Sequence, residues 1–151
     1  MSSILMIDEI TDIEDGKKIY ASRTLSKDES YLADHFPGHP VMPGVLMLET
    51  LVQAASWLVR INTDFRFPVA VMSSARSVRY GRFVIPGDRL DIEVELLSKD
   101  GSRGAFRGRG TVDGQVAVSG RFELEWFRPD GAGDSLETEL RERYLELRGK
   151  R

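Results

Sequence analysis

The side chains best suited to proton transfer in this sequence are two histidines, His35 and His39, which lie four positions apart. An imidazole binds or releases a proton near neutral pH and therefore serves as a general acid or base. The 151-residue chain has no cysteine, which excludes a thiolate nucleophile, a disulfide framework and a cysteine zinc site. Any histidine chemistry must come from the one segment that carries these two residues.

The histidine segment is predicted to be a loop. Three prolines and two glycines lie between residues 36 and 44, a density that neither a helix nor a central strand tolerates. Asp34, His35 and His39 offer three potential metal ligands, but ligands at positions i and i+4 converge when the segment is helical. Since the prolines prevent a helix there, we expect no metal site.

Residues 45–60 are predicted to form a helix that is buried on most sides, because good helix formers place apolar side chains nearly all round it. Its polar exceptions are spaced by four, three and four positions and share one stripe, which consists of Glu49, Gln53, Ser56 and Arg60. Such a stripe faces solvent, a second subunit or a functional site. The spacing alone does not choose among the three.

Much of the remaining chain has the two-residue periodicity of antiparallel strands. Apolar and charged residues alternate strictly over residues 90–96, and a second alternating stretch, residues 106–112, leads into an Asp-Gly pair that signals a hairpin. Val116 begins a third stretch, in which every second residue is predicted to face the same way. We expect an α+β architecture in which about five or six antiparallel strands close over one long helix.

The length suits one domain. We expect the main domain to cover residues 1–128 and a linker with a C-terminal helical extension to cover residues 129–151. Four apolar residues fall on one face of the expected helix, namely Leu136, Leu140, Tyr144 and Leu147. The extension is interpreted as an accessory packing or interface element.

Charge and hydropathy exclude other classes. A net charge of −3 at pH 7 disfavours wholesale nucleic-acid binding. The longest mainly apolar stretch, residues 45–59, contains Glu49 and Gln53 and is too short and too polar to span a bilayer. No basic segment followed by an apolar run opens the sequence, so we expect no signal peptide. These features predict a cytoplasmic protein.

Three motifs carry a resemblance to a known family: residues 35–46 (HFPGHPVMPGVL) followed by Glu49 and Gln53, residues 82–90 (RFVIPGDRL), and residues 111–114 (TVDG). Over about residues 4–127 the sequence resembles the (3R)-hydroxyacyl-[acyl-carrier-protein] dehydratases of bacterial fatty acid synthesis, FabZ type. The resemblance implies a hot-dog fold, in which a long central helix is wrapped by an antiparallel β-sheet. It also implies elimination of water from a (3R)-3-hydroxyacyl thioester to give a trans-2-enoyl thioester.

The resemblance assigns roles to the residues around the loop. His35 is expected to remove the proton from C2 as a neutral base. The backbone N–H groups of Gly44 and Val45, which follow Pro43 at the helix start, are expected to bind the thioester oxygen as negative charge develops on it. Gly44, which lacks a Cβ, would let the thioester approach closely.

The helix stripe supplies the second catalytic group. Glu49 is expected to orient a water or to protonate the departing hydroxyl, and Gln53 to hold its carboxyl group by a hydrogen bond. The division of proton transfers between His35 and Glu49 is left open, because the imidazole alone could carry out both. We expect no cofactor and no catalytic role for His39.

The resemblance also implies partners. In the family, the histidine and the acidic residue of one site come from two subunits, so we expect a homodimer with shared active sites, with a hexamer of three dimers as its further assembly. The expected substrate carrier is acyl carrier protein, which is acidic. Residues 76–109 contain eight Lys or Arg and five Asp or Glu. A basic rim formed by Arg76, Arg79, Arg82 and Arg89 would steer its docking, with ordinary solvated strand charges as the alternative.

Two other functions stay open on sequence grounds. A hot-dog acyl thioesterase would use the helix acid to activate water, and a diverged paralogue would bind acyl groups or the carrier without catalysis. The chain departs from the family pattern at Asp34, where many relatives have glycine, and at Gly81, where a basic residue is common.

Overall fold

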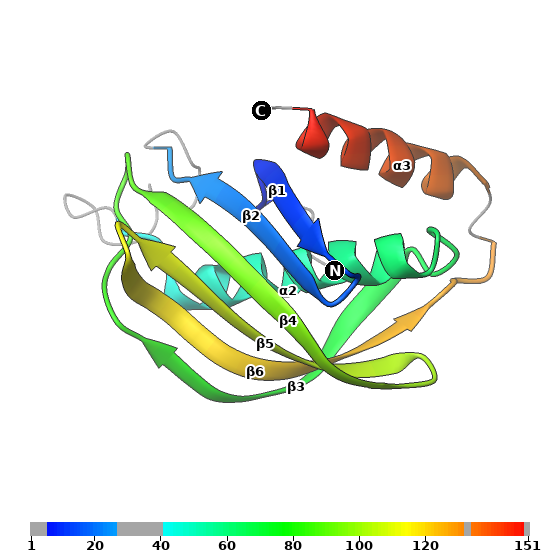
Figure 1. Ribbon diagram of the computed structural model, residues 1–151, viewed down its shortest axis with the longest axis horizontal. Coiled ribbons are helices and arrows are strands. Elements are labelled where there is room, and N and C mark those ends of the chain that lie inside the picture. The colour runs from blue at the N-terminus through cyan, green and yellow to red at the C-terminus, as the bar shows by residue number, and fades with distance from the viewer. Residues whose placement is uncertain (1–5, 27–40, 132–133, 150–151) are drawn as a thin grey trace.

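The computed structural model describes residues 6–26, 41–131 and 134–149. Within them, antiparallel strands form one six-stranded sheet in the order β1-β2-β4-β5-β6-β3, and helix α2 lies against one face of it (Figure 1). Along the chain the elements are β1 (Glu9–Glu14), β2 (Lys18–Thr24), α2 (Gly44–Asn62), β3 (Val69–Tyr80), β4 (Arg89–Asp100), β5 (Arg103–Val112), β6 (Gln115–Phe127) and α3 (Asp134–Arg148). The expected α+β architecture is confirmed.

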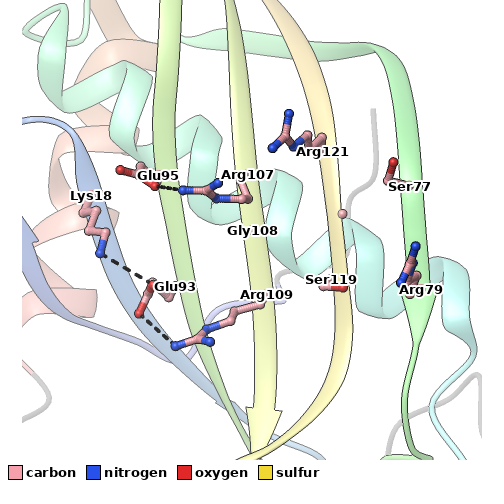
Figure 2. Close-up of a pocket in the computed structure, with 11 residues that line it drawn as sticks. Lys18, Ser77, Arg79, Glu93, Glu95, Arg107, Gly108, Arg109, Ser119 and Arg121 are labelled. Carbon is pink, nitrogen blue, oxygen red and sulfur yellow. Dashed lines mark hydrogen bonds and ion pairs between the residues drawn. The ribbon is translucent and has the colours of Figure 1, made fainter.

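The two faces of the sheet follow from the two-residue period of its strands. In β5, Phe106 and Gly108 are buried on the side of α2, whereas Arg107 and Arg109 lie on the opposite, outer face (Figure 2). A Cβ on Gly108 would lie 3.4 Å from the Leu51 side chain. The glycine therefore lets the helix lie close to the sheet.

Helix α2 forms the centre of the hydrophobic core. Leu51, Ala54, Ala55 and Leu58 have no exposed surface. The helix has 19 residues and is longer than the apolar stretch predicted from the sequence, so the expectation that it is too short and too polar for a membrane span was wrong: by length and composition alone it could match one. More than half of it is buried inside the protein, and we therefore identify it as a core helix.

The predicted hairpin between β5 and β6 is confirmed, but its first apolar residue departs from the predicted alternation. Asp113 and Gly114 have φ values of 50° and 81°, the left-handed conformations that a tight two-residue turn requires. Val116 is 41% exposed rather than buried with the alternate residues that follow it. The register of the two strands shifts between Gly110 and Thr111, and this bulge interrupts the alternation.

The predicted C-terminal helix is present as α3 and packs beside the C-terminal half of α2 (Figure 1). The Tyr144 ring centroid lies 6.4 Å from that of Trp57 and 5.9 Å from that of Phe65. Leu147 is buried, and Leu140 packs against the same core. Three of the four residues of the predicted apolar face, Leu140, Tyr144 and Leu147, thus extend the core.

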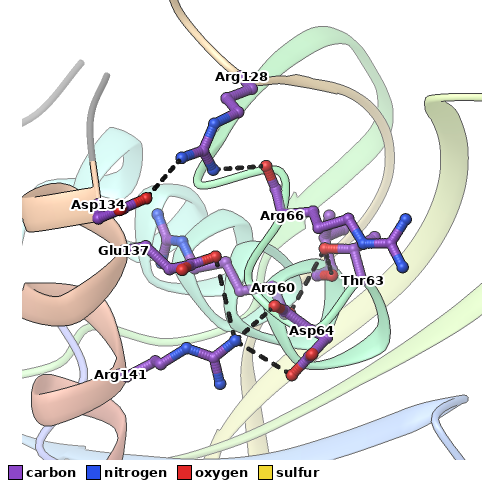
Figure 3. Close-up of polar contacts among 9 residues, drawn as sticks. Arg60, Thr63, Asp64, Arg66, Arg128, Asp134, Glu137 and Arg141 are labelled. Atoms are coloured by element: carbon purple, nitrogen blue, oxygen red, sulfur yellow. Dashed lines mark hydrogen bonds and ion pairs between the residues drawn. The ribbon is translucent and has the colours of Figure 1, made fainter. Parts of the chain in front are cut away.

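Polar contacts fix α3 to the turn that follows α2 (Figure 3). Arg141 donates to the Asp64 carbonyl oxygen at 2.8 Å, and its guanidinium lies 4.7 Å from the Phe65 ring centroid. Asp64 and Phe65 have φ values of 51° and 62°, a region that bulky residues rarely adopt. The contacts with α3 therefore stabilise a strained turn at the end of the core helix.

Replacing Tyr144 by alanine is expected to lower the free energy of unfolding by about 2 kcal/mol, because the ring loses its contacts with Trp57 and Phe65. Urea denaturation measures the change. Leu145 is the matched control, since it is 67% exposed on the same helix. If Leu145→Ala were as destabilising as Tyr144→Ala, the packing of α3 described above would be wrong.

Candidate active site

The start of helix α2 presents backbone N–H groups without helical partners. The N–H groups of Leu46 and Met47 donate to the Pro43 carbonyl oxygen at 3.0 and 3.2 Å. No side chain caps the helix, and within the described part of the chain no acceptor binds the N–H of Gly44 or Val45. These donors, at the positive end of the helix dipole, suit an oxygen that carries developing negative charge.

The Tyr80 side chain covers Gly44, a contact that the sequence did not reveal. A Cβ on Gly44 would lie 3.0 Å from the Tyr80 ring, so the absence of that atom accommodates the ring. Beside them is a mainly apolar hollow of about 500 Å³, lined by Val41, Met42, Pro43, Gly44, Met47, Tyr80, Gly81, Arg82 and Phe83. An apolar chain could lie in this hollow next to the free helix end.

Glu49 and Gln53 form the hydrogen bond predicted from their spacing. Gln53 Nε2 donates to Glu49 Oε2 at 3.0 Å, and Gln53 Oε1 accepts the Met6 N–H at 2.8 Å. The backbone donor fixes the orientation of the amide, which turns its NH₂ group toward the carboxylate. Glu49 is half-buried, so the site holds an oriented carboxyl group about one turn inside the helix.

The other two polar residues of the helix stripe serve the fold. The buried Ser56 hydroxyl donates to the Val52 carbonyl oxygen at 2.9 Å. Arg60 donates to the Pro68 carbonyl oxygen at 2.9 Å and lies 4.6 Å from the Trp57 ring centroid. Burial lowers the pKa of Arg60 to about 10, and the side chain stays charged at neutral pH. Only the N-terminal half of the stripe, Glu49 and Gln53, therefore stays a candidate for catalysis.

The loop over residues 81–88 connects the two chain segments that flank residues 27–40. The Leu25 N–H donates to the Asp88 carbonyl oxygen, and the Gly87 N–H donates back to the Leu25 carbonyl oxygen. The Met42 N–H donates to the Val84 carbonyl oxygen at 2.8 Å. Gly87 and Asp88 of the Pro-Gly-Asp motif therefore hold Leu25, and Val84 of the same loop holds Met42, so this one loop binds the chain on both sides of residues 27–40.

The histidines themselves lie outside the described residues. His35, His39 and the neighbouring Asp34 all fall within residues 27–40. The predicted base and the rejected metal set therefore stay predictions. What the structure brings together is the helix start, Glu49 with Gln53, and the anchors on either side of the histidine segment.

The four arginines predicted to dock a carrier do not form one group. Arg82 contacts Asp88 at 3.4 Å and Gln115 at 2.8 Å, and Arg89 contacts Asp91 at 3.0 Å. Arg76 and Arg79 lie on β3 in register with Arg121 and Ser119 of β6. The side chains of Arg121 and Ser119 lie on the outer face of the sheet, opposite α2 (Figure 2). Two of the four are thus engaged by carboxylates of their own chain.

Gly81, where the family resemblance leads us to expect a basic residue, has a steric explanation. A Cβ at this position would lie 2.2 Å from the Val116 carbonyl oxygen, and the Gly81 N–H donates to the Ala117 carbonyl oxygen at 2.9 Å. Here the chain runs directly against the first residues of β6, which leaves no room for a side chain. The glycine at position 81 is therefore required by the close approach of this chain segment to β6.

Gly81→Ala is expected to lower the free energy of unfolding by about 1–3 kcal/mol, because the added methyl group forces the backbone of β6 to move. Chemical denaturation measures the loss. Unchanged stability would show that the close approach of Gly81 to Val116 is not a constraint.

The sequence is similar to a known family profile and to named bacterial proteins. A family profile described as a FabA-like domain matches residues 1–121. A protein of Granulibacter bethesdensis named 3-hydroxyacyl-[acyl-carrier-protein] dehydratase FabZ is 38% identical over 130 residues, which cover 85% of this chain and 76% of that protein. The protein of the same name in Bacillus subtilis is 37% identical over 112 residues, 74% of this chain and 79% of that protein.

Solved structures show the same fold. The dehydratase heterocomplex ApeI:P from Xenorhabdus doucetiae matches with a TM-score of 0.68 and 25% identity over 92% of this chain and 88% of that chain. A hypothetical thioesterase with coenzyme A from Streptococcus pneumoniae matches with a TM-score of 0.57 and 13% identity over 80% of this chain and 86% of that chain. At that identity the second likeness concerns the fold alone, which is the hot-dog fold.

Proposed function

The chain belongs to the FabA-like family, with the FabZ-type dehydratases, and on that basis we propose that it is a hydro-lyase that eliminates water from a 3-hydroxyacyl chain on acyl carrier protein. The product is the corresponding trans-2-enoyl thioester, made in fatty acid biosynthesis. The relatives bear the dehydratase name at 35–39% identity over most of this chain, whereas the thioesterase matches in fold only. The thioesterase and non-catalytic alternatives are not favoured.

The observation that carries the proposal is an oriented carboxyl group close to unpaired helix donors. Glu49, held by Gln53, lies five residues after Gly44, a rise of about 7.5 Å along a helix. A 3-hydroxyacyl thioester presents its carbonyl oxygen and its C3 hydroxyl on neighbouring parts of one short chain. The helix start suits the first group and the carboxyl group suits the second.

The proposed mechanism assigns one role to each group. His35 removes a proton from C2 while the Gly44 and Val45 N–H groups stabilise the charge that develops on the thioester oxygen. The C2–C3 double bond forms as the C3–O bond breaks, and Glu49 or the protonated His35 delivers the proton with which the hydroxyl departs as water. These steps use only the protein's own side chains and backbone.

We propose that the active unit is a homodimer, in which His35 of one subunit meets Glu49 of the other. Strand β3 supports this proposal: it is a 12-residue edge strand of the sheet, and Val71, Met72 and Tyr80 on it are each more than a third exposed. A long edge with apolar side chains is a template for pairing with another chain. Assembly of three such dimers into a hexamer is part of the proposal, and sedimentation analysis measures it.

The proposed carrier partner is acidic, and the basic side chains of β3 and of the loop over residues 81–88 favour it. Arg76, Arg79, Arg82 and Arg89 are the proposed docking residues. Arg76 and Arg79 have no carboxylate partner among the residues that the structure describes, so we expect them to contribute more than Arg82 and Arg89. The proposed location is the cytoplasm.

The experiment that tests the function is incubation of the protein with 3-hydroxyacyl thioesters of different chain length, on acyl carrier protein and on coenzyme A, followed by mass analysis. We expect loss of one water from the (3R) substrates and addition of water to the enoyl products in reverse. Release of free thiol without enoyl formation would indicate a thioesterase. Carrier binding with neither reaction would indicate a non-catalytic protein.

A further inference from the structure

The outer face of the sheet, opposite α2, carries a concentration of arginines. Arg107 and Arg109 of β5, Arg121 of β6 and Arg79 of β3 line one hollow there (Figure 2). The sheet separates this hollow from Glu49, because α2 packs against the other face. The hollow is therefore separate from the proposed catalytic groups, and of the proposed docking residues only Arg79 lines it.

Strand register places arginines directly opposite one another on this face. Arg107 pairs with Arg121, and Arg121 pairs in turn with Arg76. In the next row of outward-facing residues, Arg109 pairs with Ser119, and Ser119 pairs with Arg79. Like charges directly opposite on neighbouring strands are destabilising, so folding alone does not explain the row formed by Arg107, Arg121 and Arg76.

Carboxylates compensate the arginines only on one side of the hollow. Glu95 of β4 accepts from Arg107 at 2.7 Å, while Glu93 lies 3.7 Å from both Arg109 and Lys18. Arg79 and Arg121 have no ion pair or hydrogen-bonded acceptor among the residues that the structure describes. The lining thus has five cationic side chains and two carboxylates, and the excess of positive charge lies toward β6 and β3.

The shape of the hollow and its polar lining also fit a ligand. Its volume is about 510 Å³, and Ser77 and Ser119 line it with the arginines. Ser77 has a φ of 56°, within the irregular pairing of β3 between Arg76 and Arg79. Left-handed residues of this kind cluster at binding sites, where surrounding contacts hold them in place.

We propose that this hollow binds a small ligand with more than one phosphate charge, of the diphosphate class. Guanidinium groups bind phosphate oxygens in a bidentate manner. Opposed side chains on neighbouring strands stand about 5 Å apart, and successive outward residues of one strand about 7 Å apart, so two or three arginines reach one diphosphate. A hollow with hydroxyl groups, rather than a flat basic surface, favours a small anion over a protein.

Titration of the wild-type protein with pyrophosphate, at constant ionic strength, tests the proposal by calorimetry and by thermal unfolding. We expect saturable binding and a rise in Tm with pyrophosphate concentration. Arg121→Gln is expected to weaken binding at least about tenfold. Without pyrophosphate, the same variant is expected to be as stable as the wild type or more stable, because a repulsive pair is removed.

Arg103→Gln is the matched control. Arg103 lies on the outer side of the neighbouring strand β5, is paired with Glu125 and does not line the hollow. This variant removes the same charge and is expected to keep wild-type affinity for pyrophosphate. Equal weakening by both substitutions would overturn the proposal in favour of diffuse electrostatic attraction.

Two other results would also overturn it. One is a pyrophosphate effect no larger than that of chloride at the same ionic strength. The other is binding of an acidic carrier protein, lost in Arg121→Gln, without any binding of pyrophosphate, which would assign the face to protein docking. Water elimination from a short thioester is expected to be unaffected in both variants, so failure of this proposal and failure of the proposed function can be told apart.

Discussion

A Glu49→Gln variant is expected to lose about 10²–10³-fold in kcat for water elimination. Glutamine has nearly the same shape and can still accept the hydrogen bond that Gln53 donates to Glu49 at 3.0 Å, but it cannot deliver a proton to a departing hydroxyl. The measurement is the rate of enoyl thioester formation from a saturating 3-hydroxyacyl carrier substrate. Urea denaturation in parallel is expected to show little change.

Glu142→Gln provides the matched control for this experiment, since Glu142 is exposed on α3 and remote from the helix start. It removes the same charge and is expected to leave kcat within about twofold. A Glu49→Gln protein with nearly wild-type turnover would restrict Glu49 to a structural role. That role would be to accept the hydrogen bond from Gln53, whose amide oxygen accepts the Met6 N–H.

His35→Ala is expected to lower turnover by about 10³–10⁴-fold, the largest effect of any single substitution in this chain. The proton on C2 is weakly acidic, and alanine offers no group to accept it. The proposed dimer is expected to form in this variant as in the wild type, because the edge strand β3 and the core helix are unaltered. Hydration of an enoyl thioester, followed by its absorbance, measures the loss.

The second histidine gives the comparison for His35. His39→Ala removes the same side chain from the same segment and is expected to keep turnover within about twofold, since no catalytic step requires it. Retained hydration in His35→Ala would remove the base from the proposed mechanism. Loss of turnover in His39→Ala instead would transfer the role to that residue.

The local elements could be predicted because each has a short-range signal. Two-residue alternation predicted β4 and β5, and helical spacing predicted α2 and the packed face of α3. The bond between Gln53 and Glu49 followed in the same way, because residues four apart on a helix are neighbours. Val116 escaped the prediction because a bulge shifts the pairing by one residue, and no local pattern marks that shift.

The surroundings of the site could not be predicted, because they depend on residues far apart in the chain. Tyr80 meets Gly44 only when the end of β3 reaches the start of α2. The Pro-Gly-Asp turn was recognisable as a motif, but its hydrogen bonds to Leu25, and the one between Val84 and Met42, were not. The sequence placed Arg76, Arg79, Arg82 and Arg89 in one basic group because they lie close together in the chain. In the structure Arg82 and Arg89 are bonded to Asp88 and Asp91, which distinguishes them from the other two.

By itself, the sequence determined the fold class, the core helix with its carboxyl–amide pair and, through family resemblance, the expected base at His35. Periodicity and motif spacing suffice for these because they act within a few residues. Only the tertiary structure decided what surrounds the helix start, why residue 81 must be glycine, and that arginines from three strands meet in one hollow. Strand register and loop anchoring are long-range, and they arise when the whole sheet closes on its helix.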